Sequence, residues 1–197
     1  MRIIRKEACN TKVWSGGTTT EIAIYPEGAD YAERDFIWRI SSAAVEDEES
    51  TFTSLPDYMR YLTLRQGSMG LSHDGGEWHI LRPGEVEYFD GASETKSRGR
   101  VTDFNLMLRK GKAEGGMEIF SLKKGERLSF GAMGAEESDE AELAFFVSSG
   151  EAEIAANGES EVLKTGDAAL LSGKEDLSLC ALEDSSIFAA LIKLCEG

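Results

Sequence analysis

Residues 62–91 read LTLRQGSMGLSHDGGEWHILRPGEVEYFDG, and residues 145–173 read FFVSSGEAEIAANGESEVLKTGDAALLSG. The two stretches align when one residue of slack is allowed before the hairpin. The matched positions are Gly67 with Gly150, Leu71 with Ile154, Gly76 with Gly158, Leu81 with Leu163, Gly84 with Gly166, Phe89 with Leu171 and Gly91 with Gly173. Each copy predicts an apolar strand, a glycine bend, a second strand, a hairpin, a third strand and a Gly-Glu or Gly-Asp turn. Two copies in register indicate a duplicated β-unit.

Strand signals continue outside the repeat. Apolar and polar residues alternate over 21–25 and 36–40, and helical periodicity is scarce. Asn157-Gly158 lies between two alternating runs and is a strong hairpin signal. The segment 55–58 reads LPDY and is the best candidate for a non-strand piece, such as a helical turn. The chain is therefore predicted to be all-β.

The repeat also resembles the core of cupin-type barrels, in which a Pro-Gly-Glu or similar turn precedes a strand that faces the pocket. Pro83-Gly84-Glu85 has this form in the first copy, and Gly166-Asp167 takes its place in the second. The resemblance implies a bicupin, with two tandem cupin-like jelly-roll barrels. We expect the first barrel to span residues 1–110 and the second to span 111–197.

Charge and composition exclude several classes of partner. The chain has 36 acidic and 21 basic side chains, a net charge of −15, so its surface repels nucleic-acid phosphates and anionic membranes. Acidic runs such as 46–49 and 136–140 are expected to be solvated loops. No signal peptide or membrane-spanning segment is evident, and Cys9, Cys180 and Cys195 do not form a disulfide pattern. We expect a cytoplasmic protein that binds neither nucleic acid nor membranes.

Motifs for metal or covalent chemistry are absent from the sequence. Cupin metal sites use a His-x-His pair, whereas the only histidines here are His73 and His79, on either side of a predicted hairpin. His73 is expected near an exposed hairpin tip, and His79 either faces the pocket or ends a strand. No serine or cysteine lies in a nucleophile motif. The sequence therefore predicts no metal site and no cofactor.

The two copies differ at one position that is in phase with the core. In the second copy, Leu143, Phe145 and Val147 alternate as an inward apolar face should. The corresponding position to Leu143 in the first copy is Arg60. A buried guanidinium requires an anionic partner or water, so Arg60 either pairs with a nearby carboxylate such as Asp57 or binds a ligand carboxylate. The pattern alone leaves both readings open.

Four ordered blocks of the sequence resemble the HutD/Ves family, a family associated with histidine utilisation. These blocks are WSGGTTTEIAIYP (14–26), WRIS with AV (38–45), FTSLP with MRYL and Gly67 (52–67), and VTDFNLM (101–107). The resemblance implies a bicupin that binds a small carboxylate, such as urocanate or formylglutamate, and tempers expression of the histidine-degradation genes. It also implies that Arg60 is the carboxylate ligand.

Further side chains are candidates for the ligand pocket. Strand phase places Arg39 with Ser41 and Asp103 with Asn105, where they either donate to a ligand or form a buried polar network. The expected ligand-binding residues are Arg60, Trp14, Thr18, Thr19, Ser41, His79, Asp103 and Asn105.

Two other functions remain open on the sequence. One is a metal-free isomerase or lyase that uses His79 or a carboxylate as general base. The other is an interaction module whose barrels are filled by side chains. The sequence favours a binding protein over an enzyme. It leaves the oligomeric state open, and a dimer is one state that it allows.

Overall fold

The computed structural model describes residues 1–131, 141–172 and 176–195. Within these ranges the regular structure is almost entirely β-strand, and the helix found there is a 3-10 turn, η1 (Lys6–Ala8). No helix in the described part of the chain is long and apolar enough to cross a membrane. The acidic run 136–140 lies outside the described residues. The prediction of an all-β fold is confirmed.

The chain forms two compact units. Asn10–Ala113 makes up one, called here the N-terminal unit, and Met1–Cys9 with Glu114–Gly197 makes up the other, the C-terminal unit. The first nine residues thus belong with the C-terminal unit, although the sequence analysis assigned residues 1–110 to the first barrel. Each unit contains two separate antiparallel sheets, as in a jelly roll, rather than one closed barrel.

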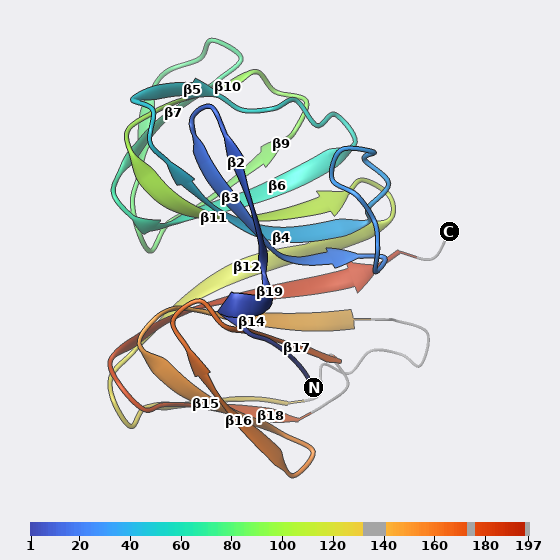
Figure 1. Cartoon of the computed structure of the whole chain (residues 1–197), viewed down its shortest axis with the longest axis vertical. Helices are drawn as coiled ribbons and strands as arrows, with labels where there is room; N and C mark the ends of the chain where they lie inside the picture. The colour runs from blue at the N-terminus through green and yellow to red at the C-terminus, as the bar shows by residue number, and fades with distance from the viewer. Residues whose placement is uncertain (132–140, 173–175, 196–197) are drawn as a thin grey trace. The chain divides into compact units, whose positions relative to one another are not determined.

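The N-terminal unit has a six-stranded and a four-stranded sheet (Figure 1). In spatial order the larger sheet contains β2 (Asn10–Trp14), β3 (Gly17–Tyr25), β4 (Trp38–Val45), β11 (Val101–Arg109), β6 (Tyr58–Gln66) and β9 (Val86–Asp90). The smaller sheet contains β5 (Glu49–Thr51), β10 (Thr95–Arg98), β7 (Met69–His73) and β8 (His79–Leu81). Residues 55–58 form a hydrogen-bonded turn, with Tyr58 N donating to Leu55 O at 3.0 Å, and no helix.

The core of the N-terminal unit joins its two sheets. Leu62 and Leu64 from the larger sheet pack in one cluster with Met69 and Leu71 from the smaller one. All four side chains are at most 1% exposed. The inward-facing side of the larger sheet is therefore the side that carries Leu62 and Leu64.

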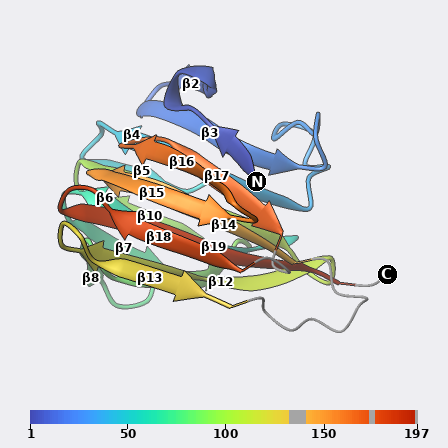
Figure 2. The same ribbon diagram turned by 90° about the horizontal axis from the view of Figure 1, so that it is seen from below.

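The C-terminal unit has a five-stranded and a four-stranded sheet, and the strands of the smaller sheet lie side by side in Figure 2. The larger contains β1 (Arg2–Ile4), β17 (Ala168–Ser172), β14 (Ala141–Ser149), β19 (Ser185–Leu194) and β12 (Ala113–Leu122). The smaller contains β13 (Arg127–Phe130), β18 (Leu177–Ala181), β15 (Glu151–Ala156) and β16 (Glu159–Lys164). Leu143, Phe145 and Val147 belong to its apolar core, as predicted.

Backbone geometry confirms the sequence repeat. Gly67 and Gly150 have φ of +91° and +87°, and Gly84 and Gly166 have +93° and +97°. Glycine adopts this region without the Cβ clash that other residues suffer. The hairpin tips correct the alignment by one residue, because Asp74-Gly75, and not Gly75-Gly76, adopts the positive φ pair found at Asn157-Gly158. Gly173 lies outside the described residues.

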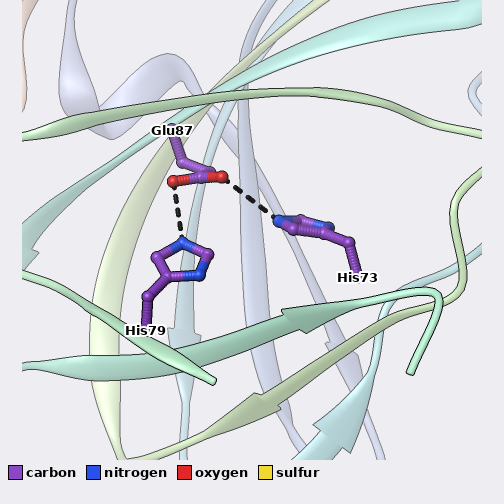
Figure 3. A group of neighbouring side chains, drawn as sticks. All are labelled: His73, His79 and Glu87. Carbon is purple, nitrogen blue, oxygen red and sulfur yellow. Dashed lines mark hydrogen bonds and ion pairs between the residues drawn. The ribbon is translucent and has the colours of Figure 1, made fainter. Parts of the chain in front are cut away.

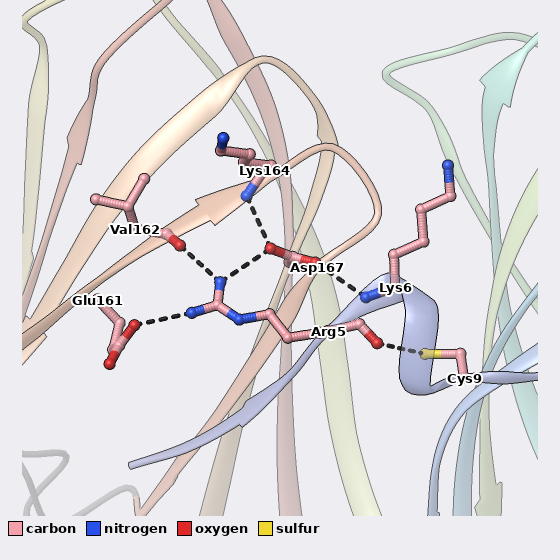
Figure 4. Close-up of polar contacts among 7 residues, drawn as sticks. All are labelled: Arg5, Lys6, Cys9, Glu161, Val162, Lys164 and Asp167. Carbon is pink, nitrogen blue, oxygen red and sulfur yellow. Dashed lines mark hydrogen bonds and ion pairs between the residues drawn. The ribbon is translucent and has the colours of Figure 1, made fainter.

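Hydrogen bonds and an ion pair hold the N-terminal segment within the C-terminal unit (Figure 4). β1 pairs with β17, and the Asp167 carboxylate accepts hydrogen bonds from Lys6 N at 2.9 Å and from Arg5 Nη1 at 3.0 Å. Burial raises the pKa of Asp167, but these bonds and one from Lys164 N outweigh it and hold the pKa below its ordinary value. The Cys9 thiol donates to Arg5 O at 3.5 Å.

Candidate functional site

One face of the six-stranded sheet gathers the polar residues singled out in the sequence. Met107 lies opposite both Arg39 and Arg60, and Asn105 lies opposite both Ser41 and Leu62. Directly paired residues point to the same side of a sheet, so these side chains share the inward face of the N-terminal unit. We call the set Arg39, Ser41, Arg60, Asp103 and Asn105 the Arg60 face; every member is at most 6% exposed.

Arg60 is buried without a hydrogen-bond partner. Its side chain is 6% exposed, and among the described residues none forms a hydrogen bond or ion pair with its guanidinium; Nε is buried and unsatisfied. The guanidinium carbon lies 4.8 Å from the Phe52 ring centre and 5.2 Å from that of Phe89. Asp57, the partner considered from the sequence, is exposed and does not pair with it. Two aromatic rings thus contact the cation while its donors stay unused.

The neighbouring Arg39, by contrast, has polar partners within the protein. Its Nε donates to Glu21 Oε2 at 2.7 Å and its Nη1 to Ser41 Oγ at 3.0 Å. The Tyr31 ring centre lies 4.5 Å from the Arg39 guanidinium carbon.

Burial lowers the pKa of Arg60 to about 10, a shift opposed by Tyr31 and Asp103. This pKa is well above 7, so Arg60 still carries its charge at neutral pH.

Asp103 and Asn105 add a mixed polar environment beside Arg60. Burial raises the pKa of Asp103 to about 6, against a hydrogen bond of 2.9 Å from Ala43 N and the attraction of Arg60. The Asn105 Oδ1 atom is buried and receives no hydrogen bond. Because Asn105 and Arg60 occupy the same face of adjacent strands, an unused acceptor lies on the same surface as the unused donors.

The candidate residues on β2 and β3 do not all lie on the same face of the six-stranded sheet. Thr19 pairs with Ala43, which is in phase with Ser41, whereas Thr18 pairs with Ala44 on the other side of the sheet. Trp14 is 40% exposed, and its Nε1 donates to Thr19 Oγ1 at 3.1 Å. Trp38 is 2% exposed. Thr18 therefore points away from the Arg60 face, while Thr19 shares it.

A second cluster lies on the same inward side and was not foreseen. Glu87 on β9 places its carboxylate between the rings of His73 and His79, at 3.2 Å from His73 Nε2 and 3.0 Å from His79 Nε2 (Figure 3). The His73 side chain, expected near an exposed hairpin tip, is only 21% exposed, whereas that of His79, the first residue of β8, is 45% exposed. Two imidazoles and a carboxylate are donors that first-row transition ions accept.

Phe89 connects the two clusters. Its ring centre lies 4.8 Å from that of His73 and 5.2 Å from the Arg60 guanidinium carbon. Glu87 is two residues before Phe89 and pairs with Leu62, so it points to the same inward side. This shared phase with Phe89 is the sequence signal that could have identified Glu87.

A hollow of about 420 Å³ lies in the C-terminal unit, lined by residues 129–131, 155–158 and 176–178. Its edge residues Gly131 and Asp176 adjoin segments outside the described ranges. No chemistry is assigned to it, and the polar clusters of the N-terminal unit remain the candidate site.

Comparison with known proteins decides the family. The HutD family model matches residues 6–189. The chain belongs to the HutD family. No curated protein matches it.

Solved structures agree with this HutD assignment. The chain resembles the protein of unknown function PA5104 from Pseudomonas aeruginosa PAO1 at 25% identity and a TM-score of 0.81, over 99% of this chain and 98% of that one. It resembles HutD from Pseudomonas fluorescens SBW25 at 24% identity and a TM-score of 0.72, over 96% and 97% of the two chains. A cupin 2 conserved barrel domain protein from Leptotrichia buccalis matches at 16% identity and a TM-score of 0.58, over 99% and 96%, which shows the fold alone. The protein is thus a cupin-fold member of a family associated with histidine utilisation.

Proposed function

We propose that this HutD-family protein binds a small carboxylate at Arg60 and thereby modulates histidine utilisation. The observation that carries the proposal is a buried guanidinium whose Nε is unsatisfied and which forms no hydrogen bond or ion pair with any residue that the structure describes. A guanidinium has five N–H donors in a planar fork that matches a carboxylate. Leaving such donors unsatisfied is costly, so a site that keeps them unused is suited to an anionic ligand.

The surroundings of Arg60 narrow the class of ligand. The Phe52 and Phe89 rings beside the guanidinium favour a flat or slender ligand. The unused Asn105 Oδ1 favours a ligand that carries an N–H or O–H donor besides its carboxylate. Urocanate and formylglutamate, the ligands implied by the family resemblance, both have a carboxylate and an N–H group. We include both in the proposal.

The test is a binding titration of the full chain with urocanate and N-formylglutamate, followed by calorimetry and by thermal shift, since a specific ligand stabilises the folded state. The Arg60→Met variant removes the guanidinium but keeps an unbranched side chain. We expect it to lose binding by roughly ten- to a hundred-fold, because a charged hydrogen bond contributes about 1.5–3 kcal/mol.

Arg98→Met is the matched control, because it removes the same charge from an exposed position of the same unit. Its affinity for the carboxylate should equal that of the unchanged protein. Binding that survives in Arg60→Met, or that weakens equally in both variants, would refute a specific role for Arg60.

A further inference from the structure

We propose that His73, His79 and Glu87 bind one divalent first-row transition-metal ion. The inference does not depend on carboxylate binding at Arg60. One ligand atom from each of these residues lies within 4.8 Å of the others. The three come from β7, β8 and β9, so that the site joins the two sheets of the N-terminal unit (Figure 3).

The distances already approach those of a bound ion. Ligands at about 2.05 Å from a tetrahedral ion lie about 3.3 Å apart. Glu87 Oε1 is 3.2 Å from His73 Nε2, and Oε2 is 3.0 Å from His79 Nε2. One ligand atom from each residue lies within 4.8 Å of the others, so the set must contract to reach the spacing of a bound ion. His79 can supply that movement, because its side chain is 45% exposed and belongs to the three-residue strand β8.

A buried hydroxyl orients His73 for this role. The Thr95 hydroxyl, on a residue that is 0% exposed, donates to Ser93 O at 3.4 Å and lies 2.8 Å from His73 Nδ1. In the tautomer with its hydrogen on Nδ1, the His73 ring donates that hydrogen to the Thr95 hydroxyl. In that tautomer the Nε2 lone pair is directed to the Glu87 side and can bind a cation. Metal-bound histidines are oriented by the same kind of second hydrogen bond.

A cation between His73 Nε2 and the Glu87 carboxylate would be bound by lone pairs from both groups. Glu87 occupies the same position relative to His79, so one cation could bind all three groups at once. Two imidazoles with one carboxylate form the donor set of open zinc sites, in which a fourth position is left for water.

The experiment uses the full chain without an affinity tag, stripped of metal with a chelator. Co²⁺ is the probe, because its visible absorption reports nitrogen and oxygen coordination, and calorimetry gives stoichiometry and affinity. We expect one Co²⁺ per chain, displaced by one equivalent of Zn²⁺. The chain has only two histidines, both at this site, so no other histidine contributes to the signal.

His79→Ala and Glu87→Gln should weaken Co²⁺ binding by at least about ten-fold, and circular dichroism checks that each folds. Glu94→Gln, at an exposed carboxylate of the same unit, should not change it. The proposal is overturned if the unchanged protein binds no Co²⁺ below about 1 mM, or if its binding equals that of both His79→Ala and Glu87→Gln. Arg60→Met should retain full Co²⁺ affinity, which separates this site from carboxylate binding.

Discussion

Arg60 lies directly opposite Phe89 in the β6–β9 ladder, and its guanidinium carbon lies 5.2 Å from the centre of the Phe89 ring. The same Phe89 ring also lies near His73, and the two ring centres are 4.8 Å apart. One phenyl ring thus contacts a buried cation with unused donors and a member of a His-His-Glu cluster. The Arg60 face and the histidine cluster are parts of one inward surface.

The free energy of unfolding of Arg60→Met should be unchanged or higher than that of the unchanged protein without ligand. A buried charge without a partner costs free energy, and its replacement by an apolar side chain removes that cost. Loss of the contacts with Phe52 and Phe89 offsets part of this gain. Urea denaturation measures the free energy of unfolding of both proteins. A decrease of more than about 2 kcal/mol would mean that Arg60 stabilises the fold and would remove the argument for a ligand.

Asp103→Asn should change how stability depends on pH. The folded-state pKa of Asp103 is raised to about 6, so the folded protein holds this proton more tightly than the unfolded chain does. Its contribution is therefore most favourable below the ordinary aspartate pKa and is lost as the pH rises through about 6. Asn stays neutral, and the stability of Asp103→Asn relative to the unchanged protein should rise between pH 4 and pH 7.

Denaturation of both proteins at several pH values checks this, because the contributions of the other groups cancel in the difference. The stability difference between the two proteins can change by at most about 3 kcal/mol, which corresponds to a shift of about two pKa units. A difference that stays constant from pH 4 to pH 7 would show that burial does not raise the pKa of Asp103.

Asp167→Asn should destabilise the C-terminal unit. Its carboxylate accepts from Lys6 N, Lys164 N and Arg5, and the amide cannot accept all three as well. We expect a loss of about 1–3 kcal/mol at neutral pH. The lowered pKa of Asp167 predicts that this difference is present above the ordinary aspartate pKa and shrinks as the pH falls through the folded value.

Glu161→Gln is the control for Asp167→Asn, because Glu161 also pairs with Arg5, at 2.8 Å, but has a side chain that is 47% exposed. Exposed ion pairs contribute about 0–1 kcal/mol. Equal losses in the two variants, measured by urea denaturation at pH 7, would contradict a special role for the buried carboxylate.

Thr95→Val should weaken metal binding without changing its stoichiometry. Valine has nearly the same shape but cannot form the hydrogen bond with His73 Nδ1, so the ring loses its fixed orientation. Removal of such outer partners typically costs about 10–100-fold in metal affinity. Co²⁺ titration gives both quantities. Affinity equal to that of the unchanged protein would mean that Thr95 has only a packing role.

Much of the architecture was readable in the sequence, because it depends on local rules. Alternating polarity indicated strands, and the glycines at the bends revealed the repeat, since positive φ restricts the residue type. Strand phase also placed Arg60 on the core-facing side of its strand, and grouped Arg39 with Ser41 and Asp103 with Asn105, whereas the strand pairing showed that all of them share one face. Family resemblance then implied the role of Arg60, although no local signal showed that its guanidinium would lack a partner.

Tertiary structure alone decided the remaining features. Glu87 meets His73 and His79 only because β9 belongs to one sheet and β7 and β8 to the other, a contact that no periodicity within a strand encodes. The pairing of β1 with β17 joins residues more than 150 positions apart, and places the first nine residues in the C-terminal unit. Local sequence fixes which way a side chain points; the packing of distant strands determines what it meets there.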